Sequence, residues 1–333
     1  MKNKNRQKNV EPAPMKILKT SPGLDPENLI ARALGIGFEV AEFKATLPLI
    51  DQVRDVEVLL LRDLPIPAQV IDAAPKLKLL QRPGQHLVGV DVKHATAKGI
   101  YVARIPSHVS GSGRKVAEHA FFLMMALAKK YKESVANIMA RRMGWPATHA
   151  LLNKTLGLVG VGETGGELAR LASAFGMRVI AVKRTIDRRI EKELGLVFLG
   201  DVSRLGDILA QSDFVSIHLP LETGTVNFFG RREFEMMKPG SFLINIARGP
   251  IIDKAALYEA LTNARLGGVG LDVFWEEPPD PNDPLLALPN VIATPHIAGA
   301  TVEDRERTAN IVAENIRLVA TGKPPKYLVS CDE

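Results

Sequence analysis

Short apolar runs alternate with longer stretches of helical periodicity along most of the chain. In the first third, five runs rich in strand-favouring residues are separated by polar or periodic segments, at residues 15–20, 38–43, 56–61, 77–82 and 100–105. A second series of six runs follows after residue 150, at 156–161, 178–183, 214–219, 241–246, 267–273 and 290–295. Strands that alternate with helices indicate parallel sheets covered on both faces. The pattern therefore predicts an α/β protein.

Two helical stretches suggest how the strands divide into domains. Residues 116–140 contain no Gly or Pro and carry apolar residues at helical spacing, so we predict one long helix there, a natural connector between two domains. A final helix at about 303–320 must bury its apolar face, and we place it against the first domain. This predicts a discontinuous substrate-binding domain, residues 15–112 and 299–329, and a dinucleotide-binding domain, residues 113–298.

Length and charge are compatible with this picture. A chain of 333 residues that is 46% hydrophobic can bury the cores of two domains. The formal net charge is +6, but Lys2, Lys4, Arg6 and Lys8 lie in a polar leader, residues 1–14, that we expect to be disordered. Because the rest of the chain is nearly balanced, we expect no nucleic-acid partner.

Cysteine content and apolar run length bear on the cellular location. The single cysteine, Cys331, rules out an internal disulfide framework and favours a reducing compartment, so we expect a cytoplasmic protein. No run approaches the roughly 18–20 apolar residues that span a bilayer, and the basic first ten residues are not followed by an apolar stretch. We therefore expect neither export nor a membrane partner.

A glycine-rich turn carries the first chemical signal. The apolar run 156–161 leads into GxGxxG at Gly160, Gly162 and Gly165, and a helical pattern follows. In a dinucleotide-binding turn, the first glycine makes the tight turn, the second lets the backbone approach a diphosphate, and the third lets helix and strand pack closely. The diphosphate would lie on the free N–H groups of the helix start, which includes Glu163 and Thr164.

The end of the next strand bears on the choice of cofactor. An NAD-binding unit normally places Asp or Glu there to accept from the ribose 2′-hydroxyl, but this chain has Lys183, Arg184 and Thr185. Two cations and a hydroxyl suit a 2′-phosphate, so we predict NADP(H) in preference to NAD(H). In the alternative, both cations are solvated strand-end charges and Asp187 binds the hydroxyl.

Three blocks near the end of the chain each follow a predicted strand. They read INIARG at 244–249, LDVFWEEP at 271–278 and TPHIAG at 294–299. In open α/β sheets, ligands bind at the carboxyl ends of strands. Taken singly, Arg248, Glu277 and His296 could be solvated side chains, but together with the glycine turn they predict a catalytic site.

These residues resemble the D-isomer-specific 2-hydroxyacid dehydrogenases, a family that includes phosphoglycerate dehydrogenases and glyoxylate/hydroxypyruvate reductases. The likeness runs from Met15 to about Val329 and includes LKLLQRPG, VAEHAFFLMMALA, KTLGLVGVGETG, SDFVSIHLPLETGT and MKPGSFLINIARGPIIDKAAL as well as the three blocks. It implies two Rossmann-like parallel-sheet domains, a flavodoxin-like substrate domain and a dinucleotide-binding domain, with the active site in the cleft between them. It also implies a homodimer.

The resemblance assigns roles to the catalytic residues. Arg248 is the substrate-anchoring arginine, His296 the acid/base, and Glu277, rather than Glu276, its carboxylate partner. Reduction of a 2-keto acid places a hydride on C2 and develops negative charge on the oxygen, which needs a proton donor. Imidazole titrates near neutral pH, a carboxylate beside it favours the protonated ring, and a guanidinium matches the carboxylate of the substrate.

Further binding residues follow from the resemblance alone. It places Ile246, Ala247 and Asp272 near the nicotinamide and His218, Pro220 and Thr225 on the adenosine side. The substrate carboxylate would contact Gln85 and His86, although relatives commonly carry smaller residues in that loop. Arg62 falls where some relatives that bind phosphorylated or larger acids place a cation, and a solvated strand-end arginine is the alternative.

Three functions remain in competition at this stage. The first is an NAD(P)-dependent D-2-hydroxyacid dehydrogenase acting on CH–OH donors, of the glyoxylate/hydroxypyruvate or the 3-phosphoglycerate type, with no metal site. The second is an NAD(P)-sensing regulatory or corepressor-like protein, because fold alone does not decide function. The third is a dehydrogenase for a one-carbon or inorganic oxyanion, although formate enzymes place a glutamine where Glu277 stands.

Overall fold

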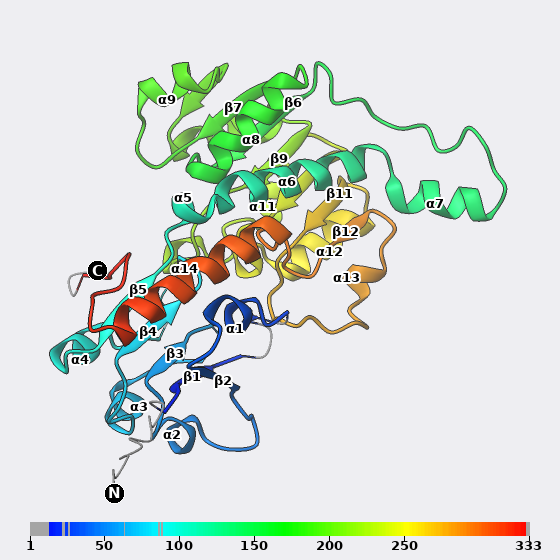
Figure 1. Ribbon diagram of the computed structural model, residues 1–333. Coiled ribbons are helices and arrows are strands. Elements are labelled where there is room, and N and C mark those ends of the chain that lie inside the picture. Colours follow the sequence, from blue (N-terminus) through cyan, green and yellow to red (C-terminus); the bar gives the residue numbers. More distant parts are fainter. Residues whose placement is uncertain are drawn as a thin grey trace, which may run out of the picture. The chain divides into compact units, whose positions relative to one another are not determined.

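The chain divides into two compact units, each with its own sheet. The structure, a computed structural model, describes residues 13–21, 24–25, 27–62, 64–85, 87 and 89–330. Unit 1 comprises the chain up to Ser110 and from Val302 onward, and unit 2 runs from Gly111 to Thr301. The sequence placed these divisions at 112/113 and 298/299. Both units alternate strands and helices (Figure 1), which confirms the predicted α/β class.

Unit 1 is built on a five-stranded sheet in the order β2-β1-β3-β4-β5. All its strand pairs are parallel. This is the doubly wound, flavodoxin-like order that the family resemblance implies. The strands are β1 (Met15–Lys19), β2 (Phe38–Glu42), β3 (Val58–Leu60), β4 (Leu79–Arg82) and β5 (Tyr101–Arg104), and the helices from this part of the chain are α1 (Leu29–Leu34), α2 (Leu49–Gln52), α3 (Ala68–Asp72), α4 (Val92–Ala97) and α5 (Ser107–Ser110).

The last helix, α14 (Val302–Ala320), returns to unit 1, as predicted. Its apolar face packs into the same core as strands β1, β3 and β4. Asn315, fully buried on this helix, donates to the Gln81 side chain at 2.7 Å and accepts from the Lys326 backbone at 2.8 Å. A buried amide with several partners ties helix, sheet and C-terminal segment to one arrangement.

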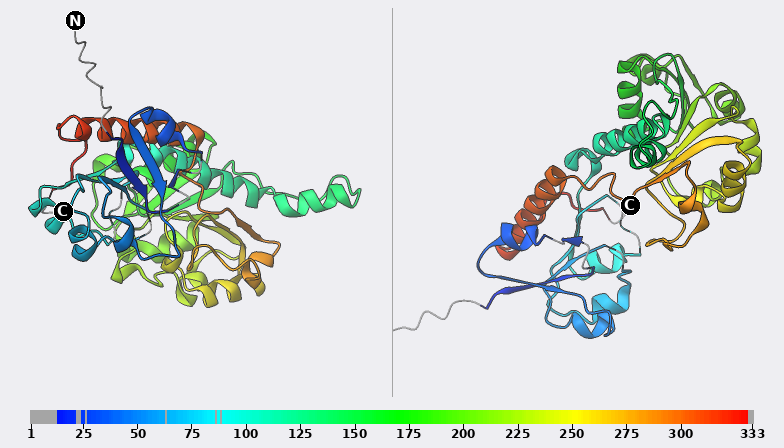
Figure 2. Two further views of the ribbon diagram at one scale, coloured as in Figure 1. Left: turned by 60° about the horizontal axis from the view of Figure 1, so that its bottom comes forward. Right: turned by 90° about the vertical axis from the view of Figure 1, so that its right-hand side faces the viewer.

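Unit 2 contains a seven-stranded parallel sheet in the order β12-β11-β10-β9-β6-β7-β8. The strand order reverses between β6 and β9, which is where ligands bind in doubly wound folds. Figure 2 shows helices on both faces of this sheet. The strands are β6 (Thr155–Val159), β7 (Arg178–Val182), β8 (Phe198–Gly200), β9 (Phe214–Ile217), β10 (Ser241–Asn245), β11 (Leu266–Leu271) and β12 (Val291–Ala293).

Every predicted strand is confirmed within two residues at each end. Strand β8, a three-residue strand at the sheet edge, was missed. The helices of unit 2 are α6 (Ser112–Ala128), α7 (Tyr131–Met139), α8 (Glu163–Ala174), α9 (Arg188–Glu193), α10 (Leu205–Gln211), α11 (Arg231–Met236), α12 (Lys254–Thr262) and α13 (Pro284–Ala287), with 3-10 turns η2 (Val202–Arg204), η3 (Thr223–Thr225) and η4 (Gly249–Ile251).

The single long helix predicted at 116–140 is wrong. The chain forms α6 and α7 with a break at Lys129 and Lys130, and Lys130 adopts the left-handed conformation at φ 47°. The Lys129 carbonyl, freed by the break, accepts from the Ser134 hydroxyl at 3.0 Å. Polar side chains of this kind can end a helix without Gly or Pro.

Packing explains both the break and the role of the two helices. Helix α6 buries Ala117, Ala120, Leu123 and Met124 in the core of unit 2, whereas α7 buries no residue. Helix α6 is therefore part of the unit 2 core and not the connector that we expected. Periodicity alone does not reveal where the packing surface for a helix ends.

Candidate active site

The glycine turn leaves β6 at the point where the strand order reverses. Gly160 has φ +95°, and a Cβ there would lie 2.6 Å from the His218 carbonyl oxygen. A Cβ on Gly165 would lie 2.8 Å from the Gly160 carbonyl oxygen, whereas one on Gly162 would meet nothing within 4 Å. The turn is therefore closed against β9 and open at Gly162. This confirms the roles predicted for the first and third glycines.

The surroundings of the turn fit a dinucleotide. The first residues of α8 are exposed at Glu163 and half-buried at Thr164, and a Cβ on Gly162 would meet open space, so the start of this twelve-residue helix can be reached by a ligand. Beneath the turn, both ring nitrogens of His218 are buried and lack a hydrogen-bond partner within the described part of the chain. Burial lowers the pKa of His218 to about 4, so this ring is neutral at pH 7.

The residues after β7 lie one strand away from the turn. The Arg184 guanidinium pairs with Glu222 of the loop after β9 at 2.8 Å, and both side chains are largely exposed. The Lys183 side chain is half-buried and makes no hydrogen bond or ion pair with the residues described here. Thr185 is exposed.

Asp187, the alternative ligand for a ribose hydroxyl, is hydrogen-bonded to Arg189. Its carboxylate caps α9 by accepting from the Arg189 backbone at 3.0 Å, and it also pairs with the Arg189 guanidinium at 2.9 Å. The side-chain hydrogen bond from Arg189 lowers the pKa of Asp187. This arrangement favours the reading in which Lys183 and Arg184 face the ribose.

Arg248 follows β10 and starts the η4 turn. The turn is held by Asn245, whose fully buried side chain accepts from the Ala247 backbone at 3.0 Å and donates to the Arg248 carbonyl at 2.9 Å. The Arg248 guanidinium donates to the Ala247 carbonyl at 2.6 Å. A single backbone bond leaves most of its donors open to a ligand. Sequence reasoning missed Asn245, although it stands inside the INIARG block.

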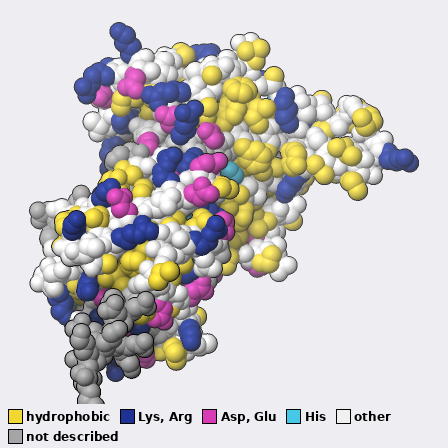
Figure 3. Space-filling model, viewed as in Figure 1, with side chains coloured by type: hydrophobic (Ala, Val, Ile, Leu, Met, Phe, Trp, Pro, Cys, Tyr) yellow, Lys and Arg dark blue, Asp and Glu magenta, His cyan; other side chains and the backbone are white. Residues whose placement is uncertain are grey.

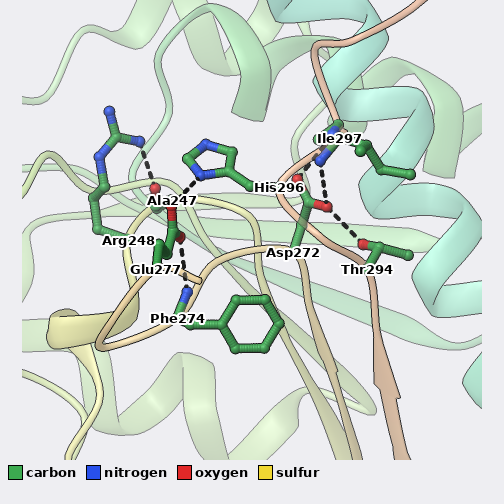
Figure 4. A network of polar contacts seen from close by, with 9 residues as sticks. Ala247, Arg248, Asp272, Phe274, Glu277, Thr294, His296 and Ile297 are labelled. Carbon is green, nitrogen blue, oxygen red and sulfur yellow. Dashed lines mark hydrogen bonds and ion pairs between the residues drawn. The ribbon is translucent and has the colours of Figure 1, made fainter. Parts of the chain in front are cut away.

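Glu277 and His296 form a direct pair. The His296 Nδ1 lies 2.7 Å from Glu277 Oε2, and the other carboxylate oxygen accepts from the Phe274 backbone at 3.0 Å. Figure 4 shows Arg248, Glu277 and His296 as one group at the ends of neighbouring strands. The side chains of His296 and Glu277 are 49% and 38% exposed, so a small ligand can reach them. The structure thus brings together the three residues predicted to be catalytic.

Asp272 lies directly after β11, which ends at Leu271. Its carboxylate is fully buried and accepts from the Ile297 and Ala298 backbones at 2.9 and 2.8 Å and from the Thr294 hydroxyl at 2.6 Å. These bonds hold the segment that carries His296. Asp272 therefore positions the segment that carries His296, and its predicted approach to the nicotinamide stays a prediction.

His119 on α6 completes this buried network. Its Nε2 lies 2.8 Å from the Thr294 hydroxyl oxygen and 3.5 Å from Asp272. Burial lowers the pKa of His119, and the charge of Asp272 opposes the shift. The sequence alone assigns His119 no role. The signal was weak, because its partners lie far along the chain.

The remaining predicted residues lie at strand ends of both units. In unit 2, the buried Thr225 donates to the Pro220 carbonyl at 2.7 Å, while Ile246 is buried and Ala247 half-buried after β10. In unit 1, Arg62 follows β3 and Gln85 lies in the loop after β4, where the Arg104 side chain donates to its carbonyl. His86, Cys331 and residues 1–12 of the expected leader lie outside the described residues.

Two further properties concern partners. Among the described residues, no helix is both long enough and apolar enough to cross a membrane. Within the same residues, no three His, Cys, Asp or Glu side chains gather as a metal site would require.

An open glycine turn at a helix start, together with a histidine–glutamate pair and an arginine at neighbouring strand ends, defines a dinucleotide-dependent dehydrogenase. Comparison with known proteins agrees. The model of the D-isomer specific 2-hydroxyacid dehydrogenase NAD binding domain matches residues 121–298. A glyoxylate reductase of Korarchaeum cryptofilum is 39% identical over 292 residues, which cover 85% of each chain.

Two other relatives span nearly all of this chain. A D-3-phosphoglycerate dehydrogenase of Methanocaldococcus jannaschii is 35% identical over 321 residues, which make up 95% of this chain and 59% of that relative. The crystal structure of D-lactate dehydrogenase with NAD+ from Lactobacillus jensenii has a TM-score of 0.75 at 28% identity and covers 95% of this chain and 100% of its own.

The chain belongs to the D-isomer-specific 2-hydroxyacid dehydrogenase family. It is an oxidoreductase that uses a nicotinamide cofactor on small 2-hydroxy or 2-keto acids, which confirms the leading prediction. The relatives named above are dehydrogenases and reductases, and they give the regulatory alternative no support.

Proposed function

We propose that this protein reduces a small 2-keto acid at the expense of NADPH, with glyoxylate, which gives glycolate, and hydroxypyruvate, which gives D-glycerate, as the first candidates. The observation that carries the proposal is the 2.7 Å contact between His296 and Glu277, with Arg248 beside it. A glyoxylate reductase that this chain matches over 85% of both lengths supports the substrate class. A 3-phosphoglycerate type is the second candidate, supported by a relative of which the match covers 59%.

His296 would donate the proton. Glu277 accepts from Nδ1, which fixes the tautomer and leaves Nε2 to face the substrate oxygen. The second oxygen of Glu277 is held by the Phe274 amide, so the carboxylate, and with it the imidazole, has one orientation. In the oxidising direction the same nitrogen would take the proton from the hydroxy acid.

Arg248 would orient the substrate by its carboxylate. Its guanidinium has five donors in a planar fork, of which one is used by Ala247. A bidentate contact to a carboxylate restricts rotation, which aids catalysis through orientation. We propose that Gln85, His86 and Arg62 also contact the substrate, with the peptide groups at Gln85 and His86 on the carboxylate.

The glycine turn and its neighbours would hold the dinucleotide, which supplies the hydride when bound. Gly160, Gly162, Glu163, Thr164 and Gly165 would receive the diphosphate through backbone amides of the turn and of α8. We assign His218, Pro220 and Thr225 to the adenosine side and Ile246 and Ala247 to the nicotinamide side. Within the proposed architecture, unit 2 is the dinucleotide-binding domain and unit 1 the substrate-binding domain.

The preference for NADP(H) rests on the residues after β7. Lys183 makes no ion pair with the residues described here, and Arg184 and Thr185 are exposed. Asp187 is held by Arg189 and so is a poor acceptor for a ribose hydroxyl. Two cations favour a 2′-phosphate, and Arg184, although paired with Glu222, is 73% exposed and reachable by it.

One experiment tests substrate and cofactor together. Glyoxylate, hydroxypyruvate, pyruvate and 3-phosphohydroxypyruvate are offered with NADPH and with NADH, and the oxidation of the cofactor is followed by its absorbance. We expect the highest kcat/KM with glyoxylate or hydroxypyruvate and NADPH. Activity confined to the phosphorylated acid would favour the second candidate, and no oxidation with any of the acids would contradict the proposal.

We also propose a homodimer in the cytoplasm. Helix α7 buries no residue. Met139 at its end and Met143 just after it are 81% and 84% exposed. Figure 2 shows α7 projecting from the rest of unit 2, and Figure 3 shows hydrophobic side chains gathered on it. Exposed apolar surface of this extent marks an interaction site. The lone cysteine of the sequence supports a reducing compartment.

A further inference from the structure

An ion pair joins two loops on opposite sides of the glycine turn. The Arg184 Nη2 atom lies 2.8 Å from Glu222 Oε2. Arg184 comes two residues after β7 ends, and Glu222 lies in the loop after β9, with β6 between these two strands. Because neighbouring strands lie about 4.8 Å apart, the ends of β7 and β9 are roughly 10 Å apart. The ion pair therefore crosses the carboxyl end of β6, where the glycine turn begins.

Glu222 is held in place by its own loop. Its backbone N–H donates to the Thr225 hydroxyl at 2.8 Å, and that hydroxyl donates to the Pro220 carbonyl at 2.7 Å. The Thr225 backbone N–H in turn donates to the Glu222 carbonyl at 2.9 Å. Since Thr225 is buried, the backbone under Glu222 is fixed and its carboxylate is presented toward β7.

The charged side chains that follow Arg184 pair with one another, and Glu222 pairs with Arg184. Asp187 is paired with Arg189, and Arg188 is paired with Glu191. Arg184 alone among these cations pairs with a carboxylate from beyond β6. Its guanidinium is 73% exposed and the Glu222 side chain 49% exposed, so the pair is weak enough to exchange for another anion.

We propose that Glu222 determines the selectivity between nicotinamide dinucleotides with and without a 2′-phosphate, by competing with that phosphate for Arg184. This inference rests on the proposed dinucleotide site. A dinucleotide with the 2′-phosphate must share Arg184 with Glu222 or displace it, and in either case it lies near a carboxylate that repels it. A dinucleotide without it leaves the ion pair intact. Glu222 therefore lowers the affinity for the phosphorylated cofactor and lets the unphosphorylated one bind.

The test is direct binding to the whole protein. Dissociation constants are measured by calorimetry for NADPH, NADH, adenosine 2′,5′-bisphosphate and AMP, with wild type and Glu222→Gln. Two of these ligands lack the nicotinamide, so the result is independent of catalysis. We expect Glu222→Gln to bind NADPH and the bisphosphate about threefold to tenfold more tightly, the scale of an exposed ion pair plus relieved repulsion. Affinities for NADH and AMP should stay within about twofold of wild type, since neither ligand competes for Arg184.

The matched control removes a similar ion pair elsewhere in unit 2. Arg231 pairs with Glu259 between α11 and α12, and the two side chains are 65% and 47% exposed. Glu259→Gln should leave all four dissociation constants unchanged. Thermal unfolding of each variant establishes that the substitutions leave the fold intact.

Arg184→Gln, alone and combined with Glu222→Gln, completes a double-mutant cycle for dinucleotide binding. If Glu222 acts by competing for Arg184, its removal should increase NADPH affinity by a smaller factor once Arg184 is gone, because only the repulsion between carboxylate and phosphate is then relieved. An unmoved NADPH-to-NADH affinity ratio in Glu222→Gln, or an equal gain with and without Arg184, would overturn the role of Glu222 and leave the proposed function standing. Wild type that binds neither dinucleotide would overturn the proposed function itself.

Discussion

His296 adopts a backbone conformation that few residues other than glycine and asparagine adopt. Its φ is 53°, in the left-handed region, which costs about 1–2 kcal/mol for a residue with a Cβ. The Asp272 carboxylate offsets this cost by accepting from the next two backbone N–H groups. Strained residues of this kind gather at functional sites, where the surrounding structure determines them. The imidazole is thereby fixed against Glu277.

At the residue scale, the first prediction concerns this pair. His296→Ala should lower kcat for keto-acid reduction by roughly 100-fold or more, the scale of general acid–base catalysis. Glu277→Gln should lower kcat as well, because a neutral amide no longer favours the protonated ring. Its neighbour provides the control, since Glu276→Gln should behave like wild type. Equal effects of the two glutamate substitutions in steady-state kinetics would contradict the assignment.

A second residue-scale prediction concerns His218. Burial lowers its pKa to about 4, whereas an unfolded histidine titrates near 6.5. Between these values the unfolded chain binds a proton that the folded chain does not, so the free energy of unfolding falls as the pH falls. The loss contributed by His218 should approach roughly 3 kcal/mol at about pH 4 and be absent above pH 7.

Urea unfolding at several pH values measures this contribution. His218→Gln removes the titrating group, so its stability should fall less between pH 7 and pH 4 than that of wild type. His149→Gln is the control, because His149 is exposed. Identical pH profiles for wild type and His218→Gln would show that burial of this ring has no such consequence.

At the element scale, the turn between β6 and α8 requires glycine at Gly160 and at Gly162 for two different physical reasons. Gly160 has positive φ and lies against the His218 carbonyl, so any side chain is excluded by the protein itself. Gly162 has φ −106°, which other residues adopt, and open space at its Cβ position. A side chain at Gly162 would fit without contacting the rest of the protein. It would, however, block a ligand bound at the start of α8.

This contrast yields a paired prediction. Gly160→Ala should lower the free energy of unfolding by about 2 kcal/mol or more, from positive φ and overlap with backbone. Gly162→Ala should cost under about 1 kcal/mol but weaken dinucleotide binding by about tenfold or more, through blocked backbone approach. Thermal unfolding and calorimetric titration with NADPH check the pair. Unimpaired binding by a folded Gly162→Ala protein would contradict the site.

At the scale of the whole molecule, α7 buries none of its residues, although its Lys132 donates to the Leu286 and Leu288 carbonyls. Ile138 on its surface is 67% exposed, although helices of a monomer normally bury one face. A second copy of the chain would cover this surface.

We therefore predict that light scattering gives twice the mass of the chain for wild type. Ile138→Glu should shift this mass toward that of one chain, because a charge in an apolar interface is left without a partner. Val197→Glu, at an exposed apolar position of unit 2 away from α7, should leave the mass unchanged. A wild-type protein with the mass of one chain would contradict the homodimer.

Much of the fold and of the candidate site could be predicted from the sequence because each depends on short, local patterns of residues. The glycine turn, the strand positions and the blocks around Arg248, Glu277 and His296 each depend on a few consecutive residues. The break between α6 and α7 could not be predicted from the sequence, since it depends on where the core of unit 2 ends. Strand β8 was also not predicted.

The amino-acid sequence by itself determined the α/β class, the glycine turn and the candidates for the catalytic group, because periodicity, glycine spacing and residue chemistry are properties of the chain. Only the tertiary structure decided which side chains meet. It placed Asp272 under the His296 segment and Glu222 on Arg184, pairs that are 25 and 38 residues apart along the chain. Such partners are chosen by the order of strands in the sheet, and no local pattern records that order.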